Sequence, residues 1–254
     1  APFITSVEPS LFGLDNFSEL GNIADIDKIF EQQEYIKWNS LRDMDDARFL
    51  GLTMPGVLMR APYKIDGTRR ESFKFRESVE NANDDYLWGN ASYAFGGVLI
   101  RAFSESGWFG QIRGMQPGKR SKGLVCDLPV CEYETDIHRK RSKPSVNLLV
   151  SDRNEKALSD LGFIPLSSVS GCEHHVFYNN ASLQRPQNFN SLSANVNAKL
   201  SSMLQYILCV SRFAHYIKVL GREKIGSFAS AQECETELQA RILQYTTASE
   251  SASN

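Results

Sequence analysis

A thiol and two imidazoles crowd into the stretch GCEHHVFYNN, residues 171–180. With two earlier cysteines they form a set of nitrogen and sulfur atoms that zinc could use, provided that about four of them converge. The candidate ligands are Cys126, Cys131, Cys172, His174 and His175. In extended chain the adjacent histidines point to opposite faces, and so do the first two cysteines. The spacing therefore favours strand and turn positions over a metal site, and we expect no bound metal.

A second thiol and imidazole lie further along the chain, in a segment with helical spacing. Cys209 and His215 are six positions apart, about 240° around a helix axis, so they cannot meet as nucleophile and base. Ser211 and His215 share a face, but no acid nearby in sequence would orient the imidazole. The chain also contains no P-loop, dinucleotide fingerprint, HEXXH or GXSXG motif. We therefore expect neither catalytic residues nor a cofactor.

Basic residues gather in two short runs, 119–122 and 138–143. Nucleic-acid binding is disfavoured, because the sequence pI is about 6.2 and neither run contains an aromatic residue that could stack on bases. Solvated loops and a protein contact remain open as alternatives. Our hypothesis is that a surface meeting an acidic neighbour contains Lys119, Arg120, Arg139, Lys140 and Arg141.

Charge is segregated along the chain although the net charge is only −2. Residues 1–50 hold ten acids and four bases, whereas residues 60–76 hold six bases and two acids. Residues 119–143 are again basic and residues 230–254 acidic. Separated patches of opposite sign suit association between copies or with a partner.

Hydrophobic spacing predicts helices over 34–43, 90–106, 152–161, 195–223 and 230–245. Strands are predicted at 108–113, 124–134, 145–150 and 163–169. Pro55 places the extended segment 51–60 at an edge or entry position, because proline cannot donate to a ladder. The predicted class is α/β (α+β), a mixed β-sheet layered with helices.

Two helices carry further expectations. Residues 207–217 are apolar nearly all round, so we expect 195–223 to be a long helix near the C-terminus that is buried in a core or in an interface. Gly96 and Gly97 interrupt 90–106 at a cost of roughly 1 kcal/mol each relative to alanine. We expect a close backbone contact to offset that cost.

Composition is that of a globular protein, with 42% hydrophobic and 23% charged residues. No apolar run approaches the 18 or so residues that a membrane span requires, so we expect no membrane insertion. Five cysteines in 254 residues argue against a disulfide framework and for a reducing compartment. The opening residues do not have the pattern of a secretory signal, and we expect the chain to be a piece of a longer protein.

Several long strings resemble one protein family. They are DDARFLGLTMP (45–55), DDYLWGN (84–90), SDRNEKALSDLGFIPL (151–166), SLQRP (182–186), VSRFAHY (210–216) and KIGSF (224–228). These strings are similar to the large subunit of the bacterial type VI secretion contractile sheath, the TssC/VipB family. Gly56 stands where that family usually has arginine, and the basic region 119–143 matches loosely.

The resemblance implies a structural role in the bacterial cytoplasm rather than an enzyme. Such a subunit polymerises with a small sheath subunit (TssB/VipA type) and other copies of itself into a helical tube around an inner tube protein (Hcp type). The tube then contracts to drive the inner tube outward. The resemblance also implies contact with an AAA+ disassembly ATPase (ClpV type) through family segments absent from this chain.

The expected organisation follows from the same resemblance. Residues 1–50 would form a helical N-terminal part of the sheath core, 51–247 a mixed α/β core domain, and 248–254 a disordered tail. Two other interpretations stay open: a sheath protein of another contractile injection machine, and an enzyme that uses a metal or a Cys/His pair.

Overall fold

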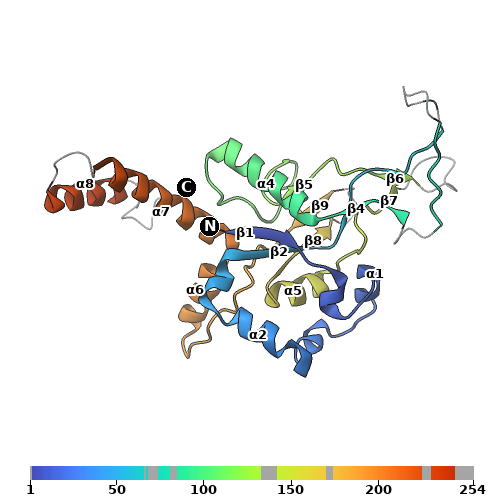
Figure 1. Cartoon of the computed structure of the whole chain (residues 1–254), viewed down its shortest axis with the longest axis horizontal. Coiled ribbons are helices and arrows are strands. Elements are labelled where there is room, and N and C mark those ends of the chain that lie inside the picture. Colours follow the sequence, from blue (N-terminus) through green and yellow to red (C-terminus); the bar gives the residue numbers. More distant parts are fainter. Residues whose placement is uncertain are drawn as a thin grey trace. The chain divides into compact units, whose positions relative to one another are not determined.

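The computed structural model describes residues 2–65, 67, 74–80, 85–132, 142–169, 174–224 and 230–243 (Figure 1). The chain forms two compact units, Ala1–Leu208 and Cys209–Asn254, and each is considered by itself. No described helix is both long enough and apolar enough to cross a bilayer. The expected tail, 248–254, lies outside the described residues.

A five-stranded mixed sheet forms the centre of the first unit, in the order β1-β2-β8-β9-β5. Its strands are β1 (Phe3–Ser6), β2 (Leu50–Met54), β8 (Phe163–Ser168), β9 (His175–Phe177) and β5 (Leu124–Val125). β1, β2 and β8 run parallel, whereas β9 is antiparallel to β8 and to β5. The predicted mixed α/β class is therefore confirmed.

β8 contributes buried side chains to both faces of this sheet, because successive strand residues point to opposite sides. Phe163 belongs to one core cluster, and Ile164 and Leu166 belong to the other. The ring of Phe163 lies 5.3 Å from that of Phe12 and stacks on Trp38 at 6.0 Å, measured between centroids. An aromatic cluster thus fixes the helical segments to this side of β8.

Helices cover both faces of the sheet (Figure 1). The face with Phe163 packs against α1 (Phe17–Leu20), α2 (Ile36–Arg42), α5 (Asp152–Asp160) and the 3-10 turns η1 (Pro9–Phe12), η2 (Ile26–Ile29) and η3 (Gln33–Tyr35). A further 3-10 turn, η4 (Asp45–Phe49), leads directly into β2. The other face packs against α4 (Ala91–Ser106) through Ala91, Phe95, Val98 and Ala102. Their spacing places all four on one helical stripe.

Two short hairpin-like pairs complete the described strands. β3 (Val57–Leu58) pairs with β4 (Trp88–Gly89), and β6 (Cys131–Glu132) pairs with β7 (Ser142–Lys143), both antiparallel. Leu58, Tyr86 and Cys131 form a small core cluster between these pairs.

The expectation for Pro55 was wrong, because β2 is an interior strand with β1 on one side and β8 on the other. Pro55 follows Met54, the last residue of β2. Its missing N–H therefore falls outside the ladder and disturbs no pairing.

Two predicted strands are absent from the described residues. None of 108–113 is in a strand, and 145–150 contributes only an isolated bridge between Val146 and Val57. The apolar residues in these segments are buried all the same, as Ile112, Val146 and Leu148 show. A loop that buries some of its apolar side chains in a core can show the same alternation of apolar and polar residues as a strand.

The long helix predicted over 195–223 is two helices, α6 (Leu192–Ser201) and α7 (Leu204–Lys224). The break arises because the backbone N–H of Leu204 donates to Asn180, at 2.8 Å, and the carbonyl of Ser202 accepts from Ser182, at 3.1 Å. The expected burial in a core is also wrong outside the first turn of α7, and α6 has no buried residue. Leu204 and Ile207 are buried, whereas no residue from Leu208 to Glu223 is.

The second unit consists, in its described part, of the rest of α7 and of α8 (Ala231–Leu243). Ser230 and Glu233 open α8 with reciprocal bonds: the backbone N–H of each donates to the side chain of the other, at 2.9 and 3.2 Å. These reciprocal bonds form a capping box, whose sequence motif is a serine followed three residues later by a glutamate.

Candidate functional site

The adjacent histidines of GCEHHVFYNN lead into and begin β9. His175 is buried opposite Ser168 on β8, and His174 is half-buried. Burial, with a smaller effect from His174, lowers the pKa of His175 to about 4, so its imidazole is neutral at pH 7. Cys172 lies outside the described residues. Among the residues that are described, no three His, Cys, Asp or Glu side chains are placed to hold a metal ion.

The second thiol and imidazole lie on α7, as their spacing predicted. The helix is continuous from Cys209 to His215, so the two side chains stay on different sides of its axis. The His215 ring lies beside that of Tyr216, with centroids 6.4 Å apart.

The hypothetical charged interface is described only in part. Lys119 and Arg120 lie exposed in a turn, where Arg120 pairs with Asp127 at 3.0 Å. Both partners of that pair are about two-thirds exposed or more, so the pair can open at little cost. The other three members, Arg139, Lys140 and Arg141, lie outside the described residues.

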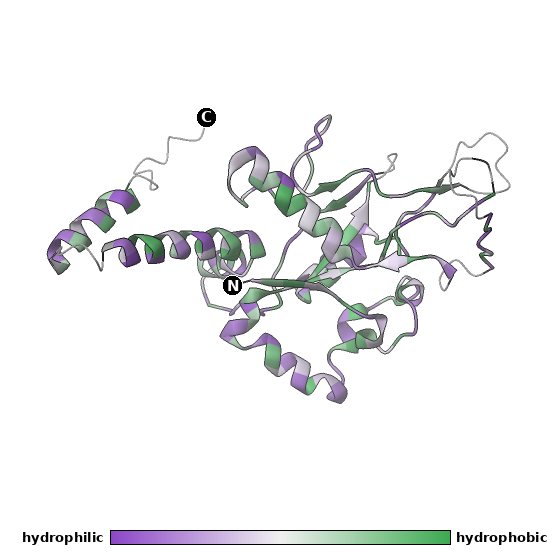
Figure 2. Ribbon diagram, turned by 45° about the horizontal axis from the view of Figure 1, so that its top comes forward, coloured by the Kyte–Doolittle hydropathy of each residue, from purple (hydrophilic) through white to green (hydrophobic). Residues whose placement is uncertain are grey.

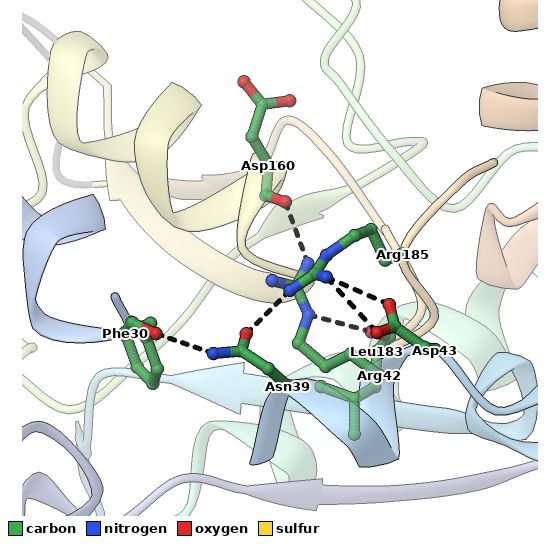
Figure 3. Close-up of polar contacts among 7 residues, drawn as sticks. All are labelled: Phe30, Asn39, Arg42, Asp43, Asp160, Leu183 and Arg185. Atoms are coloured by element: carbon green, nitrogen blue, oxygen red, sulfur yellow. Dashed lines mark hydrogen bonds and ion pairs between the residues drawn. The ribbon is translucent and has the colours of Figure 1, made fainter. Parts of the chain in front are cut away.

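A polar cluster around a buried arginine is a feature that the sequence did not reveal (Figure 3). Arg42 ends α2 with only 3% of its surface exposed. Its Nε donates to the Leu183 carbonyl at 3.2 Å, and its Nη2 donates to the Asp160 carbonyl at 3.0 Å. One guanidinium thus joins α2, the end of α5 and the segment after β9.

A second arginine strengthens this junction. Arg185 donates to Asp43 at 3.0 Å and to Asn39 Oδ1 at 2.6 Å, while Asn39 Nδ2 donates to the Phe30 carbonyl at 2.7 Å (Figure 3). Burial, and secondly the charge of Arg185, lower the pKa of Arg42 to about 10, which leaves Arg42 protonated at pH 7. Backbone carbonyls therefore neutralise much of the cost of burying Arg42.

Gly162 allows the chain to approach the end of α5 closely. Its φ is +86°, and a Cβ atom there would lie 3.0 Å from the Leu183 carbonyl oxygen and 3.1 Å from that of Ser182. Glycine satisfies both constraints at once. The segment SLQRP, residues 182–186, can thereby lie against α5.

A hollow of about 290 Å³ opens beside this cluster. Its wall comes from the end of α5, the segment after β9 and α6, and its polar lining includes Asp160, Ser182, Gln184, Arg185, Asn195 and Lys199. Lys199 pairs with Asp160 at 2.9 Å across the wall. The described lining contains neither cysteine nor histidine, and its polar side chains offer hydrogen bonds and charge.

Local spacing did not predict these contacts. Asp43 ends the helix predicted over 34–43, and Arg185 of the same chain binds it. The available signal was the string SLQRP, which was noted for its resemblance to a family and not for a contact. Nothing in local spacing shows that it lies against α2.

Large apolar side chains are exposed on several helices, whose ribbons carry hydrophobic residues in green between hydrophilic ones in purple in Figure 2. In the first unit Tyr93 and Ile100 on α4 are 70% and 72% exposed, and Leu192 on α6 is 81% exposed. In the second unit Val210 on α7 is 64% exposed. Exposed apolar groups in such number suit a protein that contacts other proteins.

Comparisons of this sequence with known proteins identify its family. Residues 1–184 match the family model of the EvpB/VC_A0108 tail sheath N-terminal domain, and residues 193–254 match that of the EvpB/VC_A0108 tail sheath gpW/gp25-like domain. The chain is 38% identical over 246 residues to the type VI secretion system sheath protein TssC1 of Pseudomonas aeruginosa. That alignment covers 96% of this chain and 49% of the relative, so the chain spans about half the length of the curated relative. The chain belongs to the TssC/VipB family of type VI secretion sheath proteins.

Proposed function

We propose that the protein containing this chain is a structural subunit that polymerises with a small sheath subunit into a contractile helical tube around an inner tube. The observation that carries this proposal is the 38% identity to a type VI sheath protein over 96% of the chain. Contraction of the tube would propel the inner tube outward. An AAA+ ATPase would disassemble the contracted tube, and the whole cycle would take place in the bacterial cytoplasm.

The surface of the chain supports an assembling rather than a catalytic role. A helical polymer requires two different, complementary patches on each subunit, because a heterologous contact that does not close repeats indefinitely. Exposed apolar residues such as Tyr93, Ile100 and Leu192 could form such patches, and segregated charge could fix their register. We propose no enzymatic step and no cofactor.

Contraction calls for subunits that stay rigid while the contacts between them change. The cluster of Arg42 and Arg185 supports rigidity within the first unit, because it ties α2 to the end of α5 and to residues 182–186. Rearrangement would then be confined to the outer surfaces.

The deciding experiment is co-production of the complete gene product with its small sheath subunit, followed by negative-stain microscopy. Hollow tubules with a cogwheel cross-section are expected. Soluble monomers only, under conditions in which both proteins fold, would contradict the proposal.

The basic residues predicted to meet an acidic neighbour can be tested in the same system. Lys119→Glu with Arg120→Glu should reduce tubule yield at low salt more than at high salt, because screening weakens exposed charge pairs. Arg153→Glu with Lys156→Glu, two exposed charge reversals on α5, is the matched control. Unchanged assembly at both salt concentrations would remove Lys119 and Arg120 from the interface. Reversing Arg139, Lys140 and Arg141 extends the test to the rest of the hypothesis.

A further inference from the structure

A groove of about 270 Å³ lies between α7 and α8, within the second unit. The α7 residues along it recur every three or four positions, which places them on one face of that helix. The groove is therefore a space toward which two helices turn apolar faces. Its apolar lining consists of Phe213, Tyr216, Ile217 and Leu220 on α7 and of Leu238 and Ile242 on α8.

The polar groups along this groove are engaged within their own helices. Arg241, which also lines it, pairs with Glu237 one turn earlier, at 3.2 Å. The hydroxyl of Tyr216 accepts from Nε of Arg212 at 2.6 Å, and the guanidinium of Arg212 lies over the Tyr216 ring, 5.2 Å from its centroid. The surface that the groove offers for binding is therefore mainly apolar, and an occupant should bring apolar side chains to it.

The second unit has no core of its own in the part of the chain that the structure describes. No side chain in 209–223 or 230–243 is buried. A domain is stabilised when its elements bury their apolar faces, and two helices that bury none cannot offset the entropy lost in ordering them. Yet residues 193–254, which include both helices, match the model of a sheath-protein domain. A core for these helices therefore requires a further segment of protein.

We infer that the groove between α7 and α8 binds an apolar segment of the same polypeptide from outside residues 1–254. The alignment to the curated relative covers 49% of that protein, so a protein of its length has about as much chain outside this region as within it. Residues 244–254, QYTTASESASN, follow α8 directly but contain Tyr245 as their only large apolar or aromatic residue. They are too polar to fill the groove.

A segment of the same polypeptide is favoured over a second copy because of when each would arrive. A second copy covers the groove only after association, so every unassembled subunit would expose two apolar helix faces to water. A segment of the same chain is always present at the high effective concentration that a covalent connection provides. This inference goes beyond the proposed function, because it requires no polymer.

Two residues of equal exposure allow the wild-type protein to be tested. Ile242 lines the groove and is 37% exposed, whereas Val219 on α7 does not line it and is 38% exposed. Hydroxyl-radical labelling of the unassembled complete gene product would compare the two, each relative to its rate in the urea-denatured protein. Ile207, which is covered, is 8% exposed. A fall of Ile242 to that level should slow its labelling roughly fourfold, while Val219 is unchanged.

Photo-cross-linking identifies the occupant. In the complete gene product, Phe213 would be replaced by its photoreactive analogue benzoylphenylalanine, with and without the small sheath subunit. A denaturing gel separates links within one chain from links between chains, and mass spectrometry locates the attachment. We expect a product of single-chain mass, attached outside residues 1–254, in both samples. His215, replaced by the same analogue, is the control, because it is exposed and lies about 200° around α7 from Phe213.

Several results would overturn the inference. A product with the mass of two copies would assign the groove to a second copy, and one with the mass of a copy plus the small subunit would assign it to that subunit. Attachment only within residues 1–254, equal yields from Phe213 and His215, or equal labelling of Ile242 and Val219 would also contradict it. Failure to form tubules would count against the sheath function alone, because the unassembled protein answers this question.

Discussion

Arg185 and Asp43 are joined across 142 positions of sequence: Nη1 of Arg185 donates to Oδ1 of Asp43 at 3.0 Å, with Oδ2 at 3.4 Å. Nη2 of the same arginine donates to Asn39 Oδ1, four residues earlier on α2. A single guanidinium therefore holds two successive turns at the end of α2 against residues 182–186. The strength of this junction can be measured.

Arg185→Ala should lower the free energy of unfolding by about 1 kcal/mol, because the bonds are several but the pair is half exposed. Urea unfolding of the purified protein measures the change. Arg48→Ala is the control, since Arg48 pairs with Asp45 only three residues away at an exposed turn. An effect of Arg185→Ala no larger than that of Arg48→Ala would show that the junction contributes nothing.

Arg42→Met should cost more, about 3 kcal/mol, although the new side chain is apolar and similar in length. The Leu183 and Asp160 carbonyls lose their charged donor in a buried setting, and such unsatisfied groups are expensive. Arg42→Lys should recover only part of the loss, because an ammonium cannot reproduce the two divergent bonds of the fork. A loss below 1 kcal/mol for the methionine variant, in the same urea assay, would contradict this role.

Gly96→Ala and Gly97→Ala should each raise the free energy of unfolding by about 1 kcal/mol. The expected close contact was wrong, because no described atom beyond the neighbouring residues and the adjacent backbone of the same helix lies within 4 Å of a Cβ built at either position. Thermal unfolding would reveal the gain. Gly162→Ala is the opposing control: its φ of +86° and the Leu183 carbonyl at 3.0 Å should make it destabilising.

His175 should make the protein less stable in acid. Its pKa is lowered from 6.5 to about 4 by burial, so the folded state binds fewer protons than the unfolded state between these values. The contribution of His175 to the free energy of unfolding is fully present above pH 6.5. It is lost as the pH falls toward 4, by about 3 kcal/mol in total. His175→Leu should flatten the difference in unfolding free energy between pH 7 and pH 4. His215→Leu, an exposed helix position, should not.

Helices with complete local signals were predictable from sequence. Ser151 caps α5 by accepting from the Asn154 N–H, and Gly162 follows its end with a positive φ. Ser230 and Glu233 form the capping box of α8, and the apolar stripe of α4 faces the sheet as expected. These features depend on residues within a few positions of one another, which is why spacing alone identifies them.

The candidate site could not be predicted in this way. No sequence pattern around Arg42 or Ser182 marks either residue as part of a site. The segment 182–186 reaches α5 and α2 only because the chain packs closely against Gly162. The sequence also did not predict that β2 is an interior strand. A proline one residue beyond a strand end reads in sequence like a proline within the strand.

The sequence by itself determined the family, the mixed α/β class and the capped helices, because long ordered strings and short-range hydrogen bonds are written in neighbouring residues. The tertiary structure alone decided the strand order, the break between α6 and α7, and the cluster in which Arg42 and Arg185 meet their partners. Those features rest on contacts such as that from Arg42 to Asp160, 118 positions apart, and Arg185 to Asn39, 146 positions apart. These contacts stabilise the protein only after burial of the shared core has brought distant segments together.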